Sequence, residues 1–140
     1  MSGNLSLTIR NDVSELPRLF QAAEPFMEEN RLSPGCRYAA LLALEEMITN
    51  IIKYGYDDRG AHEIAVSLCA GGGNLRIRLE DDGHEFDPVA APDPEKGKPL
   101  HEMKIGGLGI HLVRSMVDEI VYRRDRGRNL LDIRISADKA

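Results

Sequence analysis

Three polar side chains recur at helical spacing within residues 37–54, and each carries a functional group that can do chemistry. At about 100° per residue, Glu46, Asn50 and Lys53 fall in one wedge of this predicted helix, opposite its apolar stripe. A carboxylate can take a proton, an amide oxygen can bind a metal ion and an ammonium can hold a phosphate. The wedge is therefore either one wall of a site or the solvated polar face that surface helices usually have.

A second group of acidic residues lies where a predicted strand ends and an irregular segment begins. Asp81 and Asp82 follow the apolar run, and Gly83 allows tight approach of another backbone segment. A carboxylate at a strand end can accept a hydrogen bond from an exocyclic amine, which is one way to recognise adenine. An acidic turn is the alternative, whereas a calcium loop is disfavoured because the D-x-D-x-D-G series with a distal Glu is missing.

A glycine-rich segment leads into a third predicted helix. Free backbone N–H groups and the helix dipole at such a start favour anions, so the segment is either a phosphate site or an ordinary helix-entry turn. It matches neither the dinucleotide motif nor the P-loop, because Leu112 replaces the third Gly and the P-loop Lys is missing. The residues of the segment are Gly106, Gly107, Leu108, Gly109 and Ile110.

Apolar periodicity predicts the elements that must position these groups. Strands are expected at residues 5–9, 64–68, 75–79, 120–124 and 129–136. Helices are expected at residues 16–27, 37–54 and 109–119, the first with Ser14 as its N-cap. Four of the seven prolines fall within residues 87–99, so no regular element is expected there. Strands that bracket separate helices indicate an α+β sandwich with a largely antiparallel sheet.

Other reactive side chains are assigned no chemistry. Arginines straddle the predicted hairpin tip at residues 125–128 and are interpreted as a solvated turn, with a partner-docking edge as the alternative. The four histidines are scattered and show no metal-ligand spacing. Cys36 and Cys69 lack C-x-x-C spacing, which predicts free thiols in a reducing compartment and hence a cytoplasmic location. The arginines at the tip are Arg123, Arg124, Arg126 and Arg128.

Length and composition limit the classes of protein. A chain of 140 residues with 42% hydrophobic side chains is expected to form one domain with one core, without disulfides or a structural metal. The net charge of −5 and the 5% aromatic content disfavour nucleic-acid binding. Neither a signal peptide nor a run of roughly 18 apolar residues is present, so no secretion and no membrane partner are expected.

In combination and in this order, the three segments resemble the boxes of the GHKL ATP-binding fold, which histidine kinases share with the gyrase and mismatch-repair ATPases. A short N-terminal strand and helix, a compact lid and the lack of a dimerisation histidine helix make the chain similar to the anti-sigma factor serine kinases of bacteria. The resemblance covers residues 5–136. It implies a single domain over residues 1–140, with an ATP lid at about 87–105. The implied fold is a two-layer α/β sandwich (the Bergerat fold), with a mostly antiparallel sheet packed under three helices.

The resemblance also implies roles for the helix residues. The segment from Leu44 to Asn50 matches the family pattern E-x-x-x-N, which implies Glu46 as the general base and Asn50 as the Mg²⁺ ligand. Lys53 and Tyr54 follow at phosphate-facing positions, and Tyr54 stands where many relatives carry His.

Further residues are assigned to ATP in the same way. Asp81-x-Gly83 matches the box that recognises adenine, and Phe86 opens the F-D-P that is usual in this branch. The backbone amides of residues 106–110 are implied to hold the phosphates. Asn129 departs from the family, which often has a Thr near the adenine at this position.

The function implied by the resemblance is that of a Mg-ATP-dependent protein-serine kinase. It would phosphorylate an anti-anti-sigma (STAS-domain) partner and sequester a sigma factor by partner switching, and a homodimer is possible. The predicted lid lacks arginines that could clamp the γ-phosphate, which favours the alternative of a non-catalytic, nucleotide-dependent switch module. A detached histidine-kinase domain acting in trans is a third hypothesis. Glu46 argues for the kinase, because a pure binding module needs no base facing the phosphate.

Overall fold

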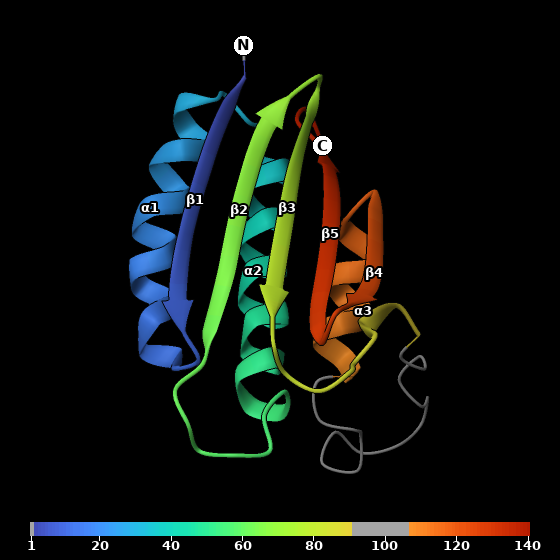
Figure 1. Cartoon of the computed structure of the whole chain (residues 1–140). Helices are drawn as coiled ribbons and strands as arrows, with labels where there is room; N and C mark the ends of the chain where they lie inside the picture. The colour runs from blue at the N-terminus through green and yellow to red at the C-terminus, as the bar shows by residue number, and fades with distance from the viewer. Residues whose placement is uncertain (1, 91–106) are drawn as a thin grey trace.

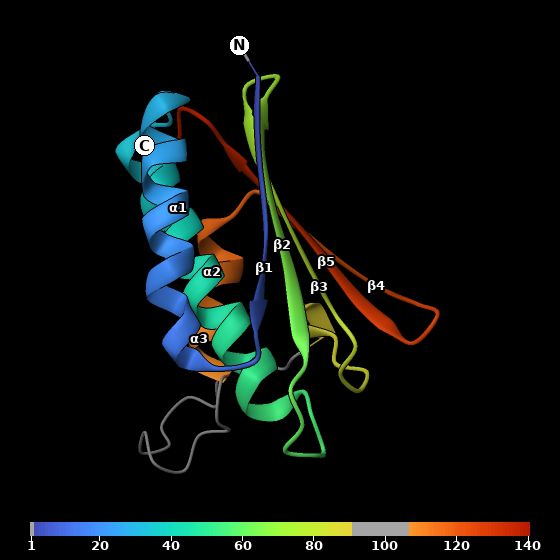
Figure 2. The same ribbon diagram turned by 60° about the vertical axis from the view of Figure 1, so that its left-hand side comes forward.

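The computed structural model describes residues 2–90 and 107–140. In this part of the chain, five strands form one antiparallel sheet, and three helices cover one of its faces (Figures 1 and 2). The strands lie in the order β1-β2-β3-β5-β4. The strands are β1 (Gly3–Arg10), β2 (Glu63–Gly71), β3 (Asn74–Asp81), β4 (Glu119–Asp125) and β5 (Arg128–Ser136), and the helices are α1 (Leu16–Glu29), α2 (Pro34–Tyr54) and α3 (Gly107–Met116). The predicted α+β class with an antiparallel sheet under three helices is confirmed.

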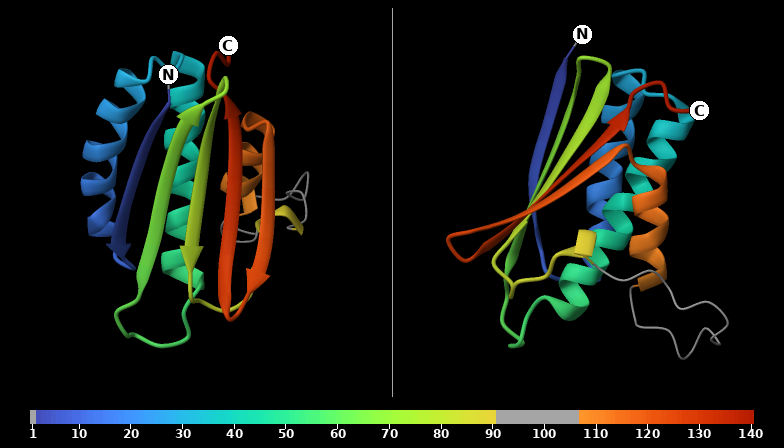
Figure 3. Two further views of the ribbon diagram at one scale, coloured as in Figure 1. Left: turned by 45° about the horizontal axis from the view of Figure 1, so that its top comes forward. Right: turned by 90° about the vertical axis from the view of Figure 1, so that its right-hand side faces the viewer.

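The core lies between the sheet and the helix layer. On β3, Leu75, Ile77 and Leu79 are buried, while Arg76 and Arg78 between them are exposed. This alternation places every second side chain under the helices and the others on the uncovered face. Figure 3 shows that the sheet is twisted, with the β4–β5 hairpin crossing β1 at a large angle.

Two hairpin turns fix the register of the strand pairs that they connect, β2 with β3 and β4 with β5. Both central residues of the β2–β3 turn, Gly72 and Gly73, have positive φ angles, as do Arg126 and Gly127 between β4 and β5. Two-residue turns with positive φ at both positions match the right-handed twist of the flanking strands. The predicted hairpin with its tip at residues 125–128 is therefore confirmed.

The helix starts differ from the predictions. Ser14 is not the N-cap of α1, because Asp12 Oδ1 accepts a hydrogen bond from Ser14 N and a 3₁₀ turn (Val13–Glu15) precedes the helix. Helix α2 begins at Pro34 rather than near residue 37, because Ser33 caps it by accepting from Cys36 N at 3.1 Å.

The region around the predicted lid also differs. A short 3₁₀ helix (Pro88–Ala90) forms where no regular element was expected. Helix α3 spans residues 107–116 rather than 109–119, because β4 already begins at Glu119. The remainder of the predicted lid, residues 91–105, and Gly106 of the glycine-rich segment lie outside the described residues.

Candidate functional site

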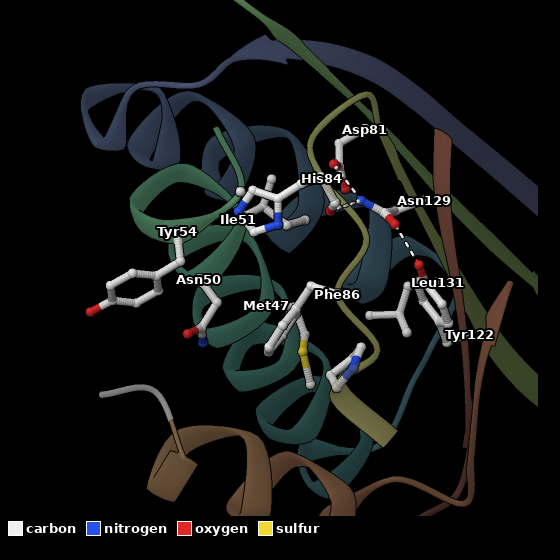
Figure 4. A pocket seen from close by; sticks show the side chains of 12 residues that line it. Met47, Asn50, Ile51, Tyr54, Asp81, His84, Phe86, Tyr122, Asn129 and Leu131 are labelled. Atoms are coloured by element: carbon white, nitrogen blue, oxygen red, sulfur yellow. Dashed lines mark hydrogen bonds between the residues drawn. The ribbon is translucent and has the colours of Figure 1, made fainter. Parts of the chain in front are cut away.

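A pocket opens between the second half of α2, the end of β3 and the start of β5 (Figure 4). Its walls are largely apolar and carry a few polar groups, which is typical of sites for small molecules. Helix α2 contributes four side chains, the end of β3 and the segment after it contribute another four, and the β4–β5 hairpin contributes three. The lining residues are Met47, Asn50, Ile51, Tyr54, Gly55, Asp81, His84, Phe86, Pro88, Tyr122, Asn129 and Leu131.

Asp81 is the buried carboxylate of this pocket. Its side chain lies at the end of β3 and the residue is only 3% exposed. Oδ1 accepts hydrogen bonds from Gly83 N at 2.8 Å and from Asn129 Nδ2 at 3.0 Å. Both bonds that the described residues make to this carboxylate end on Oδ1, so Oδ2 is left to accept a donor from a ligand.

Gly83 brings the segment after β3 against the end of α2. A Cβ at Gly83 would collide with the carbonyl oxygen of Gly55, and His84 N donates to that same oxygen at 2.9 Å. The tight backbone approach predicted for Gly83 is confirmed. This backbone contact joins two parts of the pocket lining, Gly55 at the end of α2 and His84 after β3, without using any side chain.

Two of the three residues in the polar wedge of α2, Glu46 and Asn50, are at least half-buried. Asn50 is 9% exposed, and its Nδ2 donates to the Glu46 carbonyl oxygen at 2.7 Å. Only the amide nitrogen can donate to a carbonyl, so the Asn50 Oδ1 remains available as an acceptor. The half-buried Glu46 carboxylate lies against α3, where a Cβ at Gly109 would collide with it. Lys53, by contrast, is exposed and does not line the pocket.

The start of α3 offers backbone donors beside Glu46. The helix begins at Gly107, and the N–H groups of its first turn, here those of residues 107–109, have no acceptor within the helix. The side chain of Ile110 is buried in the core and cannot reach a ligand. Tyr54 and Phe86 are partly exposed at the pocket (Figure 4).

Replacing Gly109 with Ala should reduce turnover while leaving the free energy of unfolding nearly unchanged. The added Cβ would displace the end of a flexible Glu46 side chain, so the free energy of unfolding should change by less than about 1 kcal/mol. If Glu46 is catalytic, a displacement of about 1 Å should reduce turnover by about 100-fold. Urea unfolding and a turnover assay of the same preparation test this. Full turnover in the variant would contradict a catalytic position for Glu46.

Three residues of the β4–β5 hairpin belong to the site although their role was not predicted from the sequence. Tyr122 and Arg124 hydrogen bond to Asn129, which in turn bonds Asp81. The interpretation of the hairpin-tip arginines as a solvated turn is therefore wrong for Arg124. The sequence signal was limited to Asn129 itself, a polar residue in the inward apolar series of β5, and the register that places it opposite Asp81 is seen only in the structure.

A histidine bridges two carboxylates next to the pocket. The ring nitrogens of His62 lie 2.8 Å from Asp58 Oδ1 and 3.2 Å from Asp82 Oδ1, and the ring stacks on Tyr56 with 4.2 Å between centroids. Both nitrogens face acceptors, which requires an imidazolium that donates on both sides. The hydrogen bond to Asp58, supported by that to Asp82, raises the pKa of His62 above its ordinary value of 6.5.

This raised pKa predicts a pH dependence of stability. The folded protein binds the His62 proton more tightly than the unfolded chain, so the stabilisation is complete below about pH 6.5 and is lost as pH rises through the folded-state pKa. The urea midpoint should therefore fall between pH 6 and 8.5, and His62→Gln should flatten this part of the curve. His84→Gln, which changes an exposed ring, is the control. An equal slope in wild type and His62→Gln would contradict the charged bridge.

The fold and the pocket together define a class of protein. A mostly antiparallel sheet under three helices, with a buried carboxylate in an apolar pocket beside a glycine-rich helix start, is the arrangement of a GHKL-type ATPase domain. The chain belongs to the family of histidine kinase-like ATPase domains, whose model matches residues 9–135. The family recognised from the sequence is confirmed.

Among curated relatives, the chain is similar to serine-protein kinase RsbW of Listeria monocytogenes serotype 4a (strain HCC23), with 30% identity over 90 residues, 61% of this chain and 57% of that relative. It is also similar to serine/threonine-protein kinase BtrW of Bordetella bronchiseptica, with 25% identity over 104 residues, 74% of this chain and 73% of that relative. The chain therefore spans little more than half the length of the RsbW relative.

A solved structure shares the fold. The crystal structure of the RsbU and RsbW domains of a Mycobacterium tuberculosis protein superposes with a TM-score of 0.67 at 16% sequence identity. The match covers 96% of this chain and 32% of that chain. Within the residues that the structure describes here, none of the helices combines the length and apolar character that a membrane span needs.

Proposed function

We propose that this chain is a Mg-ATP-dependent protein-serine kinase that phosphorylates an anti-anti-sigma partner with a STAS domain and holds a sigma factor as its other partner. The observation that carries the proposal is the position of the Glu46 carboxylate, against the first turn of α3 and on the same helix as the pocket residue Asn50. A carboxylate beside helix N–H groups combines a base with phosphate donors. The names of RsbW and BtrW support serine as the acceptor.

The pocket residues fit an adenine ring. Met47, Ile51 and Leu131 supply apolar contacts for the faces of a purine, and Asp81 Oδ2 supplies the acceptor that an exocyclic amine needs. Tyr54 and Phe86 stand at the exposed part of the pocket and are proposed to contact the nucleotide there.

The residues also fit Mg²⁺. Within residues 2–90 and 107–140, no cluster of three His, Cys, Asp or Glu side chains could hold a metal, so an ion at this site must take most of its ligands from phosphates and water. Mg²⁺ has this preference, and Asn50 Oδ1 is the oxygen that would hold it. When bound, Mg²⁺ neutralises charge on the phosphates.

The phosphotransfer step assigns a task to each group. Glu46 accepts the seryl proton as the seryl oxygen forms a bond to the γ-phosphorus. The bond from that phosphorus to the β–γ bridging oxygen breaks, and ADP leaves with the electron pair. The backbone N–H groups of residues 107–109 and the ammonium of Lys53 bind phosphate oxygens and offset the developing charge. Residues 1–140 are proposed to act as one domain, with an ATP lid at about residues 87–105.

The proposal is tested by incubating the protein with labelled Mg-ATP and purified anti-anti-sigma proteins of the source organism. The expected result is an acid-stable phosphoserine on one of them. An acid-labile label on a histidine would indicate a histidine kinase instead. If ATP binds but no phosphoprotein forms, the non-catalytic switch that the arginine-free lid sequence favours would replace the kinase.

A further inference from the structure

Asn129 is the centre of the hydrogen bonds beside the pocket (Figure 4). Its Nδ2 donates to Asp81 Oδ1 and to the His84 carbonyl oxygen, both at 3.0 Å. Its Oδ1 accepts from Tyr122 Oη at 2.6 Å and from an Arg124 guanidinium nitrogen at 3.0 Å. The residue is 7% exposed. Every polar atom of this buried amide is therefore used by the protein itself.

These partners fix which end of the amide faces Asp81. A carbonyl oxygen and a carboxylate accept, so they require the NH₂ group, whereas a guanidinium only donates and requires the oxygen. Turning the amide over would place oxygen against oxygen at Asp81 and nitrogen against nitrogen at Arg124. Tyr122 and Arg124 thus hold Asn129 in the one orientation in which it donates to Asp81.

Arg124 also ties the hairpin to the segment after β3. The nitrogen that donates to Asn129 donates to the Gly83 carbonyl oxygen at 2.7 Å. The backbone N–H of Gly83 is the second donor to Asp81 Oδ1. Both donors to Asp81 are therefore linked through Arg124, and together they hold the plane of the carboxylate.

The consequence concerns the base that the pocket accepts. With Oδ1 occupied by two N–H donors, Asp81 presents Oδ2 to the pocket as an acceptor. An acceptor selects a purine with an amine at C6 and opposes one with a keto oxygen there. We infer that Asn129, oriented by Tyr122 and Arg124, is a positioning residue that sets the preference of this site for a 6-amino over a 6-keto purine. This inference rests on the proposed nucleotide binding and adds to it the residues that set base specificity.

The test compares the dissociation constants of ATP and ITP by calorimetry on the full chain. ITP has a keto oxygen in place of the C6 amine and a proton on N1, and is otherwise identical to ATP. Wild type should prefer ATP by at least about 100-fold. Asn129→Leu removes the donor and frees Asp81 to turn or to carry a proton, so the preference should fall below about tenfold. Tyr122→Phe, which removes one hydroxyl and keeps the ring, should lower it by about threefold.

Asn129→Asp provides a second signature that a purely structural role would not give. Two carboxyl groups about 3 Å apart share one proton, while the Arg124 guanidinium that faces the new carboxyl group favours its ionised form. The variant should therefore bind ATP most nearly as wild type does at the acidic end of the range, at pH 5.5. As both groups ionise, its ATP affinity relative to wild type should fall by about 100-fold towards pH 8.5. Asn4→Asp and Asn4→Leu, at an exposed position of β1, are the matched controls, and unfolding midpoints without nucleotide show whether each variant is folded.

The outcomes separate the two proposals. If wild type binds neither nucleotide, the proposed function fails. If wild type prefers ATP while folded Asn129→Leu keeps its ratio and Asn129→Asp shows no added pH dependence, the role of Asn129 is wrong although nucleotide binding stands.

Discussion

Replacing Glu46 with Gln is expected to reduce the rate of phosphotransfer by about 100- to 10,000-fold, the range for loss of a general base. The ATP dissociation constant should stay within about threefold of wild type. Gln keeps the size of the side chain and its contact with Gly109, but it cannot accept the seryl proton. Single-turnover transfer to the purified partner, alongside calorimetric titration with ATP, measures both quantities.

Glu45 provides a matched control for this experiment. It is the preceding residue on α2 and is exposed, so Glu45→Gln makes the same chemical change away from the pocket. Transfer by Glu45→Gln should be within about twofold of wild type, because the changed group is solvated. Loss of transfer in Glu45→Gln with normal transfer in Glu46→Gln would show that Glu46 is not the base.

The helix that carries Glu46 could be predicted because its signals are local. The apolar stripe lies within residues 37–54, and Gly55, which ends the helix, follows directly. The observed helix differs from the predicted one mainly at its start. The function of its polar wedge was undecided in the sequence, since charged faces usually meet solvent. The contact between Glu46 and Gly109, which are far apart in the chain, places the Glu46 carboxylate beside α3 and not in open solvent.

The network around Asn129 could not be predicted, because it depends on strand pairing between distant segments. Asp81 and Asn129 are 48 residues apart, and they meet because β5 pairs with β3 in a register that places them opposite each other. A hairpin turn specifies how the two strands that it joins pair, but no local signal in the sequence specifies the pairing of β3 with β5. Arg124 was misinterpreted for the same reason: its partner Gly83 lies on another strand end.

The misplaced cap of α1 has a different cause. Asp12 and Ser14 are both good capping residues and lie two positions apart, so propensity alone does not choose between them. The extended backbone of Asp12 lets its carboxylate accept from Ser14 N, and the 3₁₀ turn follows from that choice.

Asp81→Asn is expected to weaken ATP binding by at least about 100-fold, as judged by calorimetry. The variant is nearly isosteric, so the pocket keeps its shape. If the new NH₂ group faces the pocket, it opposes the amine of adenine. If it faces inward, it opposes the donors of Gly83 and Asn129 in a buried position, which is also unfavourable. The acceptor that adenine needs is weakened in either orientation.

The same variant should change base preference as well as affinity, which distinguishes recognition from general damage. An NH₂ group at the Oδ2 position donates to the keto oxygen of ITP, so the ATP-to-ITP preference should fall towards one or invert. Asp82→Asn, one residue away and outside the pocket lining, should leave both dissociation constants within about threefold. An Asp81→Asn protein that binds both nucleotides more weakly by the same factor would show that Asp81 supports the pocket without contacting the base, and the acceptor for the amine would then have to be sought elsewhere.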